Sequence, residues 1–112
     1  MKKINIIKKN REYNEIIKTG KKYSNEGIII YYTLNDIENY YFGFSVSKKL
    51  GNAVLRNKIK RQIKNILDKK TYKNGFKCII MVKREFIEKN YKEKEEIIFN
   101  IINKINIIMG EK

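Results

Sequence analysis

Several residue types that carry chemistry are scarce or missing in this chain of 112 residues. It has no histidine, no tryptophan and no proline, and its one cysteine is Cys78. Without histidine, the commonest general acid–base group is missing, and the cysteine has no partner to activate it. A lone cysteine forms no internal disulfide, and its place in an apolar run predicts a buried, inert thiol. These absences argue against a catalytic site made of protein side chains alone.

Long apolar runs and linkers are missing too. No apolar segment approaches the roughly 18 residues that a membrane span needs, and polar residues interrupt the N-terminal segment where a signal peptide would be apolar. Without proline or a Gly/Ser-rich stretch, nothing marks a domain boundary. Hydrophobic residues make up 42% of the chain, which is enough to bury a core. We therefore expect residues 1–112 to form one cytoplasmic domain that does not bind membranes.

Acidic residues are absent from one long segment. The chain holds 26 lysines and arginines against 12 acids, a net charge of +14. From Lys48 to Lys64 there are seven cations and no acid. A/T-rich codon usage would explain the many lysines, but it does not explain why acids stop here. Clustered positive charge in a folded chain is typical of nucleic-acid binding.

The cationic segment also has a helical pattern. Apolar residues recur at helical spacing from Leu55 to Leu67, and Asn52 is a suitable N-cap, which predicts a helix to about Lys69. On a helical wheel the apolar side chains fill an arc of roughly 120°, and the cations spread over the opposite side. Arg56 lies at the border, where its stem can pack on apolar surface while its guanidinium reaches out. Because a solvated helix face usually carries both signs, we interpret this one as a contact surface for phosphates.

The rest of the chain alternates helical and strand patterns, and its order predicts an α+β sandwich with one sheet covered by helices on one face. We expect the strands at 27–34 and 40–47 to form an antiparallel hairpin through a turn at 35–39. A first helix is predicted with Asn10 as its cap and Gly20 at its end, followed by a short strand at Tyr23 and Ser24. Further along the chain we expect a loop at 71–75 and a strand at 76–82 that is buried on both faces. The last helix should run from Asn90, in a capping box with Glu93, to about Ile108.

Aromatic residues gather on the first helix and the predicted hairpin. Strand residues alternate between faces, so Tyr31 and Tyr41 cannot both be core if one sheet face is open. An exposed ring beside lysines can stack on an unpaired base. Ordinary core packing is the alternative, and it is what we expect for Phe42 and Phe44. For Tyr13 and Tyr31 both interpretations stay open.

No sequence pattern indicates a metal site or a phosphate-binding loop. Glu93, Glu95 and Glu96 stand beside lysines at a helix start, where acids complement the helix dipole. There is no Cys/His constellation, and Gly43 and Gly51 are isolated glycines. We predict no catalytic residue, no bound metal and no cofactor in the protein itself.

Residues 44–61 read FSVSKKLGNAVLRNKIKR. This run resembles the signature of the bacterial ribonuclease P protein component, in which a strand ending in Ser-Val-Ser-Lys-Lys is followed by Gly-Asn-Ala-Val and an Arg-Asn-Arg helix. The stretches IKKNREY at 7–13 and GKKY at 20–23 resemble the family's first helix and following strand. The resemblance covers roughly the whole chain in element order, and the motif is long enough to be specific.

The resemblance implies an αβββαβα two-layer sandwich, like that of ribosomal proteins, with a left-handed strand–helix–strand crossover against the right-handed norm. It implies a subunit of an endonuclease in which a catalytic RNA, using magnesium, hydrolyses the phosphodiester at the 5′ end of precursor tRNA. The implied partners are that RNA and precursor tRNA, with no DNA. A cleft for the single-stranded 5′ leader would involve Tyr13, Ile17 and Tyr31. The residues implied to face the catalytic RNA are Lys48, Lys49, Asn52, Arg56, Asn57, Lys58, Lys60, Arg61 and Lys64.

Two positions depart from the family pattern. Lys58 stands at the third place of the Arg-Asn-Arg motif, which keeps the charge but loses the bidentate grip of arginine. Ile17 stands where the family often has a second aromatic ring, so this position offers no ring to stack on the leader.

Two other functions fit part of the pattern. A general RNA-binding structural protein, of ribosomal type, would share the fold class and the charge. A DNA-binding protein would share the charge, but here the basic helix follows a strand, whereas a helix-turn-helix reader places it after another helix.

Overall fold

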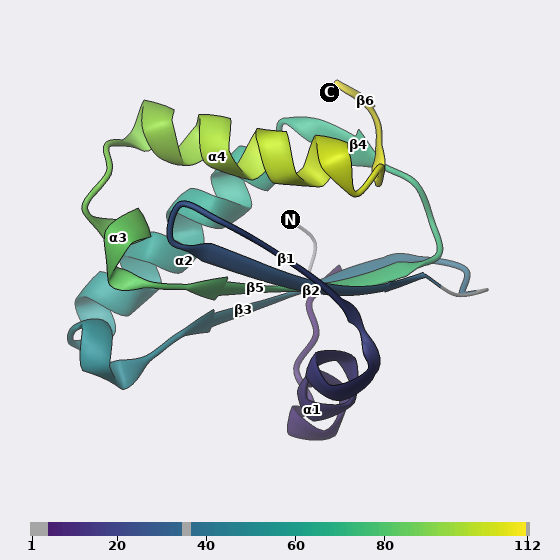
Figure 1. Ribbon diagram of the computed structural model, residues 1–112, viewed down its shortest axis with the longest axis horizontal. Helices are drawn as coiled ribbons and strands as arrows, with labels where there is room; N and C mark the ends of the chain where they lie inside the picture. Colours follow the sequence, from purple (N-terminus) through teal and green to yellow (C-terminus); the bar gives the residue numbers. More distant parts are fainter. Residues whose placement is uncertain (1–4, 35–36, 112) are drawn as a thin grey trace.

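The computed structural model describes residues 5–34 and 37–111. Of the predicted turn at 35–39, Asn35 and Asp36 lie outside the described residues. The elements, drawn in Figure 1, are α1 (Asn10–Thr19), β1 (Lys21–Asn25), β2 (Ile28–Leu34), β3 (Tyr40–Val46), the 3-10 helix η2 (Lys48–Leu50), α2 (Ala53–Leu67), β4 (Lys70–Tyr72), β5 (Phe76–Val82), α3 (Arg84–Ile87), α4 (Tyr91–Lys104) and β6 (Ile108–Glu111).

Four strands form the main sheet, in the order β1-β2-β5-β3. β2 pairs antiparallel with both β1 and β5, and β3 pairs parallel with β5. The predicted hairpin of 27–34 with 40–47 is therefore wrong, because β5 lies between these two strands. β5 takes the central place since it is apolar on both faces: Cys78 and Ile80 are buried on one side and Ile79 on the other.

Helices cover both faces of this sheet, to different extents. Figure 1 shows α2 and α4 on one side and α1 on the other. The larger core cluster joins α2, α4 and the sheet, while Ile7, Ile16 and Ile79 form a smaller cluster under α1. The expectation that one face alone is covered is wrong. Because α1 is a single short helix, that face keeps half-buried tyrosines and an open groove.

The crossover from β3 through α2 to β5 positions the basic segment. Its two strands are parallel neighbours, so the chain needs a crossover between them, and α2 supplies it. The helix therefore starts beyond the C-terminal end of the edge strand β3 and packs back on the sheet through Ile59, Ile63 and Ile66. The result is the mixed α+β fold that the sequence predicted.

The helix starts agree with their sequence predictions better than the C-terminal segment does. The caps at Asn52 and Asn90 are confirmed, the second as a full capping box with Glu93. The first helix has Lys9 at its N-cap, so Asn10 is one residue inside it.

The C-terminal segment differs from its prediction. The last helix ends at Lys104, before the predicted Ile108, and Asn106 adopts a left-handed φ of 60° that turns the chain. The following residues form β6, which pairs antiparallel with β4. Part of the expected loop at 71–75 is therefore the strand β4. The local sequence did not predict this strand, because its partner β6 lies far away in the chain.

Candidate nucleic-acid interface

The cationic residues of η2 and α2 are exposed or half-buried, whereas the apolar residues Ile59, Ile63, Ile66 and Leu67 of α2 are buried. We call these cationic residues, with the two asparagines, the basic surface. Asn57, Lys58 and Arg61 are exposed, and Lys60 and Lys64 are half-buried. The full set is Lys48, Lys49, Asn52, Arg56, Asn57, Lys58, Lys60, Arg61 and Lys64. All the sequence-predicted cations thus come together along one helix and the turn before it.

Arg56 lies at the border of this surface, as the wheel predicts. Its side chain is half-buried, and its Nε is buried without a hydrogen-bond partner among the described residues. The stem therefore packs on apolar surface. Leaving this buried donor unpaired is costly.

The start of the basic surface is held by short-range hydrogen bonds. The side-chain oxygen of Asn52 accepts from the Leu55 amide at 2.9 Å, and that of Ser47 accepts from the Lys49 amide at 3.2 Å. Gly51 between them has φ 158°, and a Cβ there would lie 2.4 Å from the Leu55 side chain. This tight turn needs glycine. Asn52 is therefore first a helix cap, and its amide NH2 is the group that remains for a ligand.

Arg84 adds a contact that sequence reasoning missed. It begins α3, directly after β5, and its Nη2 donates to the Lys49 carbonyl at 3.1 Å. This bond joins the end of the central strand to η2, which carries Lys48 and Lys49. No local sequence pattern predicts this hydrogen bond, because the two residues are 35 positions apart.

The basic surface carries no compensating acids. Within residues 5–34 and 37–111, none of its lysines and arginines forms an ion pair; Lys69 pairs with Glu95, but outside this surface. The nearest aromatic contact places Lys64 Nζ over the Phe44 ring, 5.7 Å from its centroid. The positive potential is therefore open to an external polyanion.

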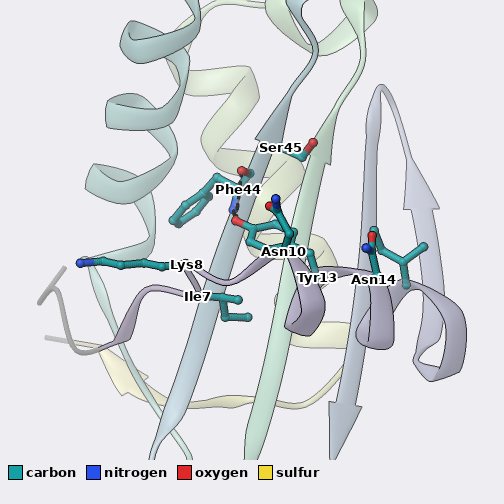
Figure 2. A pocket seen from close by; sticks show the side chains of 8 residues that line it. Ile7, Lys8, Asn10, Tyr13, Asn14, Phe44 and Ser45 are labelled. Atoms are coloured by element: carbon teal, nitrogen blue, oxygen red, sulfur yellow. Dashed lines mark hydrogen bonds between the residues drawn. The ribbon is translucent and has the colours of Figure 1, made fainter.

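A groove of about 590 Å³ lies beside this surface, between the N-terminal segment, α1 and β3. Figure 2 shows Tyr13 in the middle of the lining, with Lys8 and Asn14 on opposite sides of it. The residues that line the groove combine apolar, amide and cationic groups: Ile7, Lys8, Asn10, Tyr13, Asn14, Ile17, Phe44 and Ser45. Such a lining suits a ligand with flat apolar faces, polar edges and negative charge.

Tyr13 links α1 to the edge strand. Its hydroxyl accepts from the Phe44 amide at 2.9 Å and donates to the Phe44 carbonyl at 3.3 Å. The ring lies close over Gly43, where a Cβ would come 2.7 Å from the Tyr13 oxygen. Burial raises the pKa of Tyr13, and the hydrogen bond with Phe44 opposes the shift. Tyr13 therefore stays neutral and forms one wall of the groove.

The predicted leader-cleft residues divide between the groove and the sheet beside it. Tyr13 and Ile17 line the groove, and Ile17 is 36% exposed. Tyr31 is outside the lining and packs half-buried against the cluster under α1, as Tyr41 does. Lys22 lies 6.0 Å from the Tyr31 ring centroid, so this ring has a cation beside it. Phe42 and Phe44 are buried, as expected.

Comparison with known proteins identifies the family of this chain. The family model described as Ribonuclease P matches residues 1–106. The chain belongs to the ribonuclease P protein family. The ribonuclease P protein component of Mycoplasma capricolum subsp. capricolum is 39% identical over 108 residues, which cover 94% of this chain and 99% of that protein. The component of Clostridium botulinum strain 657 is 37% identical, with 94% and 97% covered.

Solved structures of ribonuclease P proteins share the fold. The protein from Staphylococcus aureus superposes with a TM-score of 0.82 at 30% identity, over 92% of this chain and 96% of that one. The protein from Thermotoga maritima reaches 0.81 at 23% identity, over 89% and 96%, which shows the fold alone. The resemblance is confirmed, and a ribonuclease P protein subunit is supported over a general structural RNA-binding protein.

Several groove residues were not predicted individually, although the family motifs contain them. Lys8 and Asn10 lie in IKKNREY, and Phe44 and Ser45 open the long motif. A helical or strand pattern does not single them out, because they meet only when the N-terminal segment lies along β3: the Ile7 amide donates to the Phe42 carbonyl at 2.8 Å.

Other predicted features can be placed as well. Cys78 is fully buried in β5, and burial raises the pKa of its thiol, so it stays protonated. In the described part of the chain no group of three or more His, Cys, Asp or Glu side chains could hold a metal ion. No helix in residues 5–34 or 37–111 is long and apolar enough to cross a bilayer.

Proposed function

We propose that this chain is the single-domain protein subunit of a cytoplasmic ribonuclease P whose catalytic RNA carries out the 5′ maturation of tRNA. In this proposal the basic surface binds the catalytic RNA, the groove binds the 5′ leader of precursor tRNA, and no protein side chain takes part in bond cleavage. Membership of the ribonuclease P family supports it, together with a basic surface that carries no acid.

The basic surface would bind RNA mainly by neutralising phosphates. Cations on a rigid helix meet several phosphates at once, and each contact releases a counterion, so affinity falls steeply with salt. Arg56 and Arg61 offer bidentate contacts, while the lysines act as point charges. Asn57, exposed on the same side, can hydrogen-bond a phosphate, a base edge or a 2′-hydroxyl.

The groove would hold unpaired nucleotides of the leader. Lys8 supplies a charge for a phosphate, Asn10 and Asn14 supply amides for base edges, and Ile17 supplies an exposed apolar contact. Tyr31, half-buried in the cluster under α1 with Lys22 at its ring, would stack on a base further along the strand. Binding both the leader and the catalytic RNA would reduce the repulsion between two polyanions.

Magnesium is the metal that the family function implies. The described residues offer no cluster of acidic, cysteine or histidine side chains that fits it. We therefore place the metal with the RNA, whose phosphates are its ligands, and assign no step to it in the protein.

The observation that carries this proposal is the position of a mixed apolar and amide groove directly beside an acid-free basic surface. The test compares the affinity for precursor tRNA with that for mature tRNA, each measured with the protein bound to a bacterial ribonuclease P RNA. We expect the leader to increase affinity with the protein present and to have little effect without it. An Asn14→Ala, Ile17→Ala variant should lose that increase while still binding the catalytic RNA.

A general structural RNA-binding protein would behave differently. It would bind both tRNAs equally with the catalytic RNA present, and the groove variant would behave like the unmodified protein. Either result would overturn the leader assignment.

A further inference from the structure

Lys94, on α4, is a buried lysine without an acidic partner. Its side chain is 5% exposed, although lysines almost always keep their ammonium group in water. Its Nζ donates to Gln62 Oε1 at 2.9 Å and lies 5.8 Å from the centroid of the Phe86 ring. Within residues 5–34 and 37–111 it forms no ion pair. An ammonium group held by one neutral oxygen and one ring is poorly compensated for its loss of water.

The groups that face Lys94 come from three elements. On α2 they are Gln62 and, one helical turn before it, Lys58 of the basic surface; on α3 it is Phe86. Of the acids on α4 itself, the Glu93 carboxylate accepts from the Asn90 amide and Glu95 pairs with Lys69, while Glu96 forms no ion pair with Lys94. Lys58 is therefore the charged group that acts on Lys94, and it repels it.

Burial and the neighbouring positive charge both favour the uncharged amine of Lys94. Burial lowers the pKa of Lys94 below the ordinary value for lysine, and the positive charge of Lys58 lowers it further. Lys94 thus lies buried against α2, the helix that carries most of the basic surface, through its hydrogen bond with Gln62.

We propose that Lys94 is a concealed member of the RNA-binding surface: a phosphate held at Lys58 favours the ammonium form of Lys94, so that RNA binding takes up a proton from solvent at this amine. The inference rests on the proposed function of the basic surface. A phosphate offsets the repulsion from Lys58, and in the poorly solvated space behind the helix its attraction is weakly screened. Lys94 acts on RNA through Lys58 and Gln62, which makes it a positioning residue.

The sign of the effect follows from the direction of the shift. In free protein Lys94 loses its proton at a lower pH than exposed lysines do, and in the complex it holds the proton to a higher pH. Between these two values binding requires proton uptake, so RNA affinity falls as the pH rises.

The test measures binding of a bacterial ribonuclease P RNA in monovalent salt at about pH 7 and about pH 9.5, below the ordinary lysine pKa. Unmodified protein is compared with Lys94→Met and with the matched control Lys92→Met, which removes one exposed charge from the same helix. We expect the affinity of unmodified protein and of Lys92→Met to fall about two- to tenfold more over this range than that of Lys94→Met, tenfold corresponding to one unit of pKa. Equal pH dependence in all three proteins would overturn the inference while RNA binding itself remained.

A second measurement does not need the variant. The NMR titration of the lysine ε-methylene groups follows each amine directly. We expect Lys94 to titrate below the ordinary lysine pKa in free protein and at a higher pH when the RNA is bound. An unchanged Lys94 titration on binding would refute the proton uptake, whereas failure of unmodified protein to bind the RNA at either pH would overturn the proposed function itself.

Discussion

The Tyr13 hydroxyl binds both backbone polar groups of Phe44, at 2.9 Å from the amide nitrogen and 3.3 Å from the carbonyl oxygen. Phe44 lies on β3, the edge strand of the sheet, and an edge leaves such groups unpaired. Two residues before Phe44 on the same strand, the Phe42 carbonyl accepts a hydrogen bond from the Ile7 amide. The same contacts thus close the sheet edge and form the groove wall, which links the stability of the fold to the shape of the site.

Replacing Tyr13 with phenylalanine removes this hydroxyl and keeps the ring. We expect Tyr13→Phe to lower the free energy of unfolding by about 1 kcal/mol, the usual worth of a partly buried hydrogen bond. Urea denaturation measures it. Tyr41→Phe is the matched control on the same sheet face and should change stability less. Equal stability of Tyr13→Phe and the unmodified protein would contradict the edge-closing role.

Gly43 gives the Tyr13 ring its place on β3. A Cβ at this position would lie 2.7 Å from the Tyr13 oxygen, so Gly43→Ala should displace the ring and cost about 1–3 kcal/mol. Gly110→Ala is the control, because its nearest neighbour would be 3.6 Å away. In a Tyr13→Ala background the cost of Gly43→Ala should shrink. An undiminished cost in that background would show that the clash with Tyr13 is not its cause.

Arg61 tests direct phosphate contact. It is exposed in the middle of the basic surface, so Arg61→Ala should weaken binding of the catalytic RNA and reduce the slope of log affinity against log salt by about one. Lys92→Ala removes one charge from α4 and should leave the slope nearly unchanged. A slope for Arg61→Ala equal to that of the unmodified protein would count against contact at this residue.

The unpaired charge also affects folding. A net charge of +14 on 112 residues makes the compact state repel itself, most strongly at low salt. Sulfate that binds the basic surface of the folded form should raise the melting temperature with increasing concentration. Calorimetry in sodium sulfate, against sodium chloride at matched ionic strength, separates binding from screening. Identical melting in the two salts would leave no specific anion site on this surface.

Lys94 makes stability depend on pH. Its pKa in the folded protein is lowered by burial and by Lys58, so the unfolded chain binds more protons between that value and the ordinary lysine pKa. In this window stability should rise with pH, and below it the full cost of the buried charge is present. Lys94→Met should therefore stabilise the protein by about 1 kcal/mol at neutral pH, with the gain shrinking in alkali. Chemical denaturation across this range measures it; a gain that is independent of pH would contradict the account.

Local signals predicted much of the fold. The asparagine caps at Asn52 and Asn90 and the apolar spacing of α2 and α4 are short-range features, and short-range hydrogen bonds fix those helix starts. The apolar run at 76–82 predicted a strand buried on both faces, which is what β5 is. The basic surface followed from the same helical pattern, because one helix holds most of it.

Long-range contacts were not predictable in this way. The insertion of β5 between β2 and β3, and the pairing of β4 with β6, join segments far apart in the chain. A strand pattern shows that a segment pairs without showing its partner. Tyr13 reaches Phe44 over 31 positions, and a lysine in a charged helix start gives no sign that it is buried, as Lys94 is. The groove and the concealed lysine both depend on such contacts.

The most direct test reconstitutes the enzyme. A bacterial ribonuclease P RNA is mixed with precursor tRNA at a magnesium concentration too low for the RNA to act alone, and cleavage at the 5′ end is followed with and without this protein. We predict that the protein restores cleavage and that a variant with Arg56, Arg61 and Lys64 changed to alanine does not. Absence of cleavage with the unmodified, folded protein, or full activity of the triple variant, would contradict an account in which the basic surface joins the protein to the catalytic RNA.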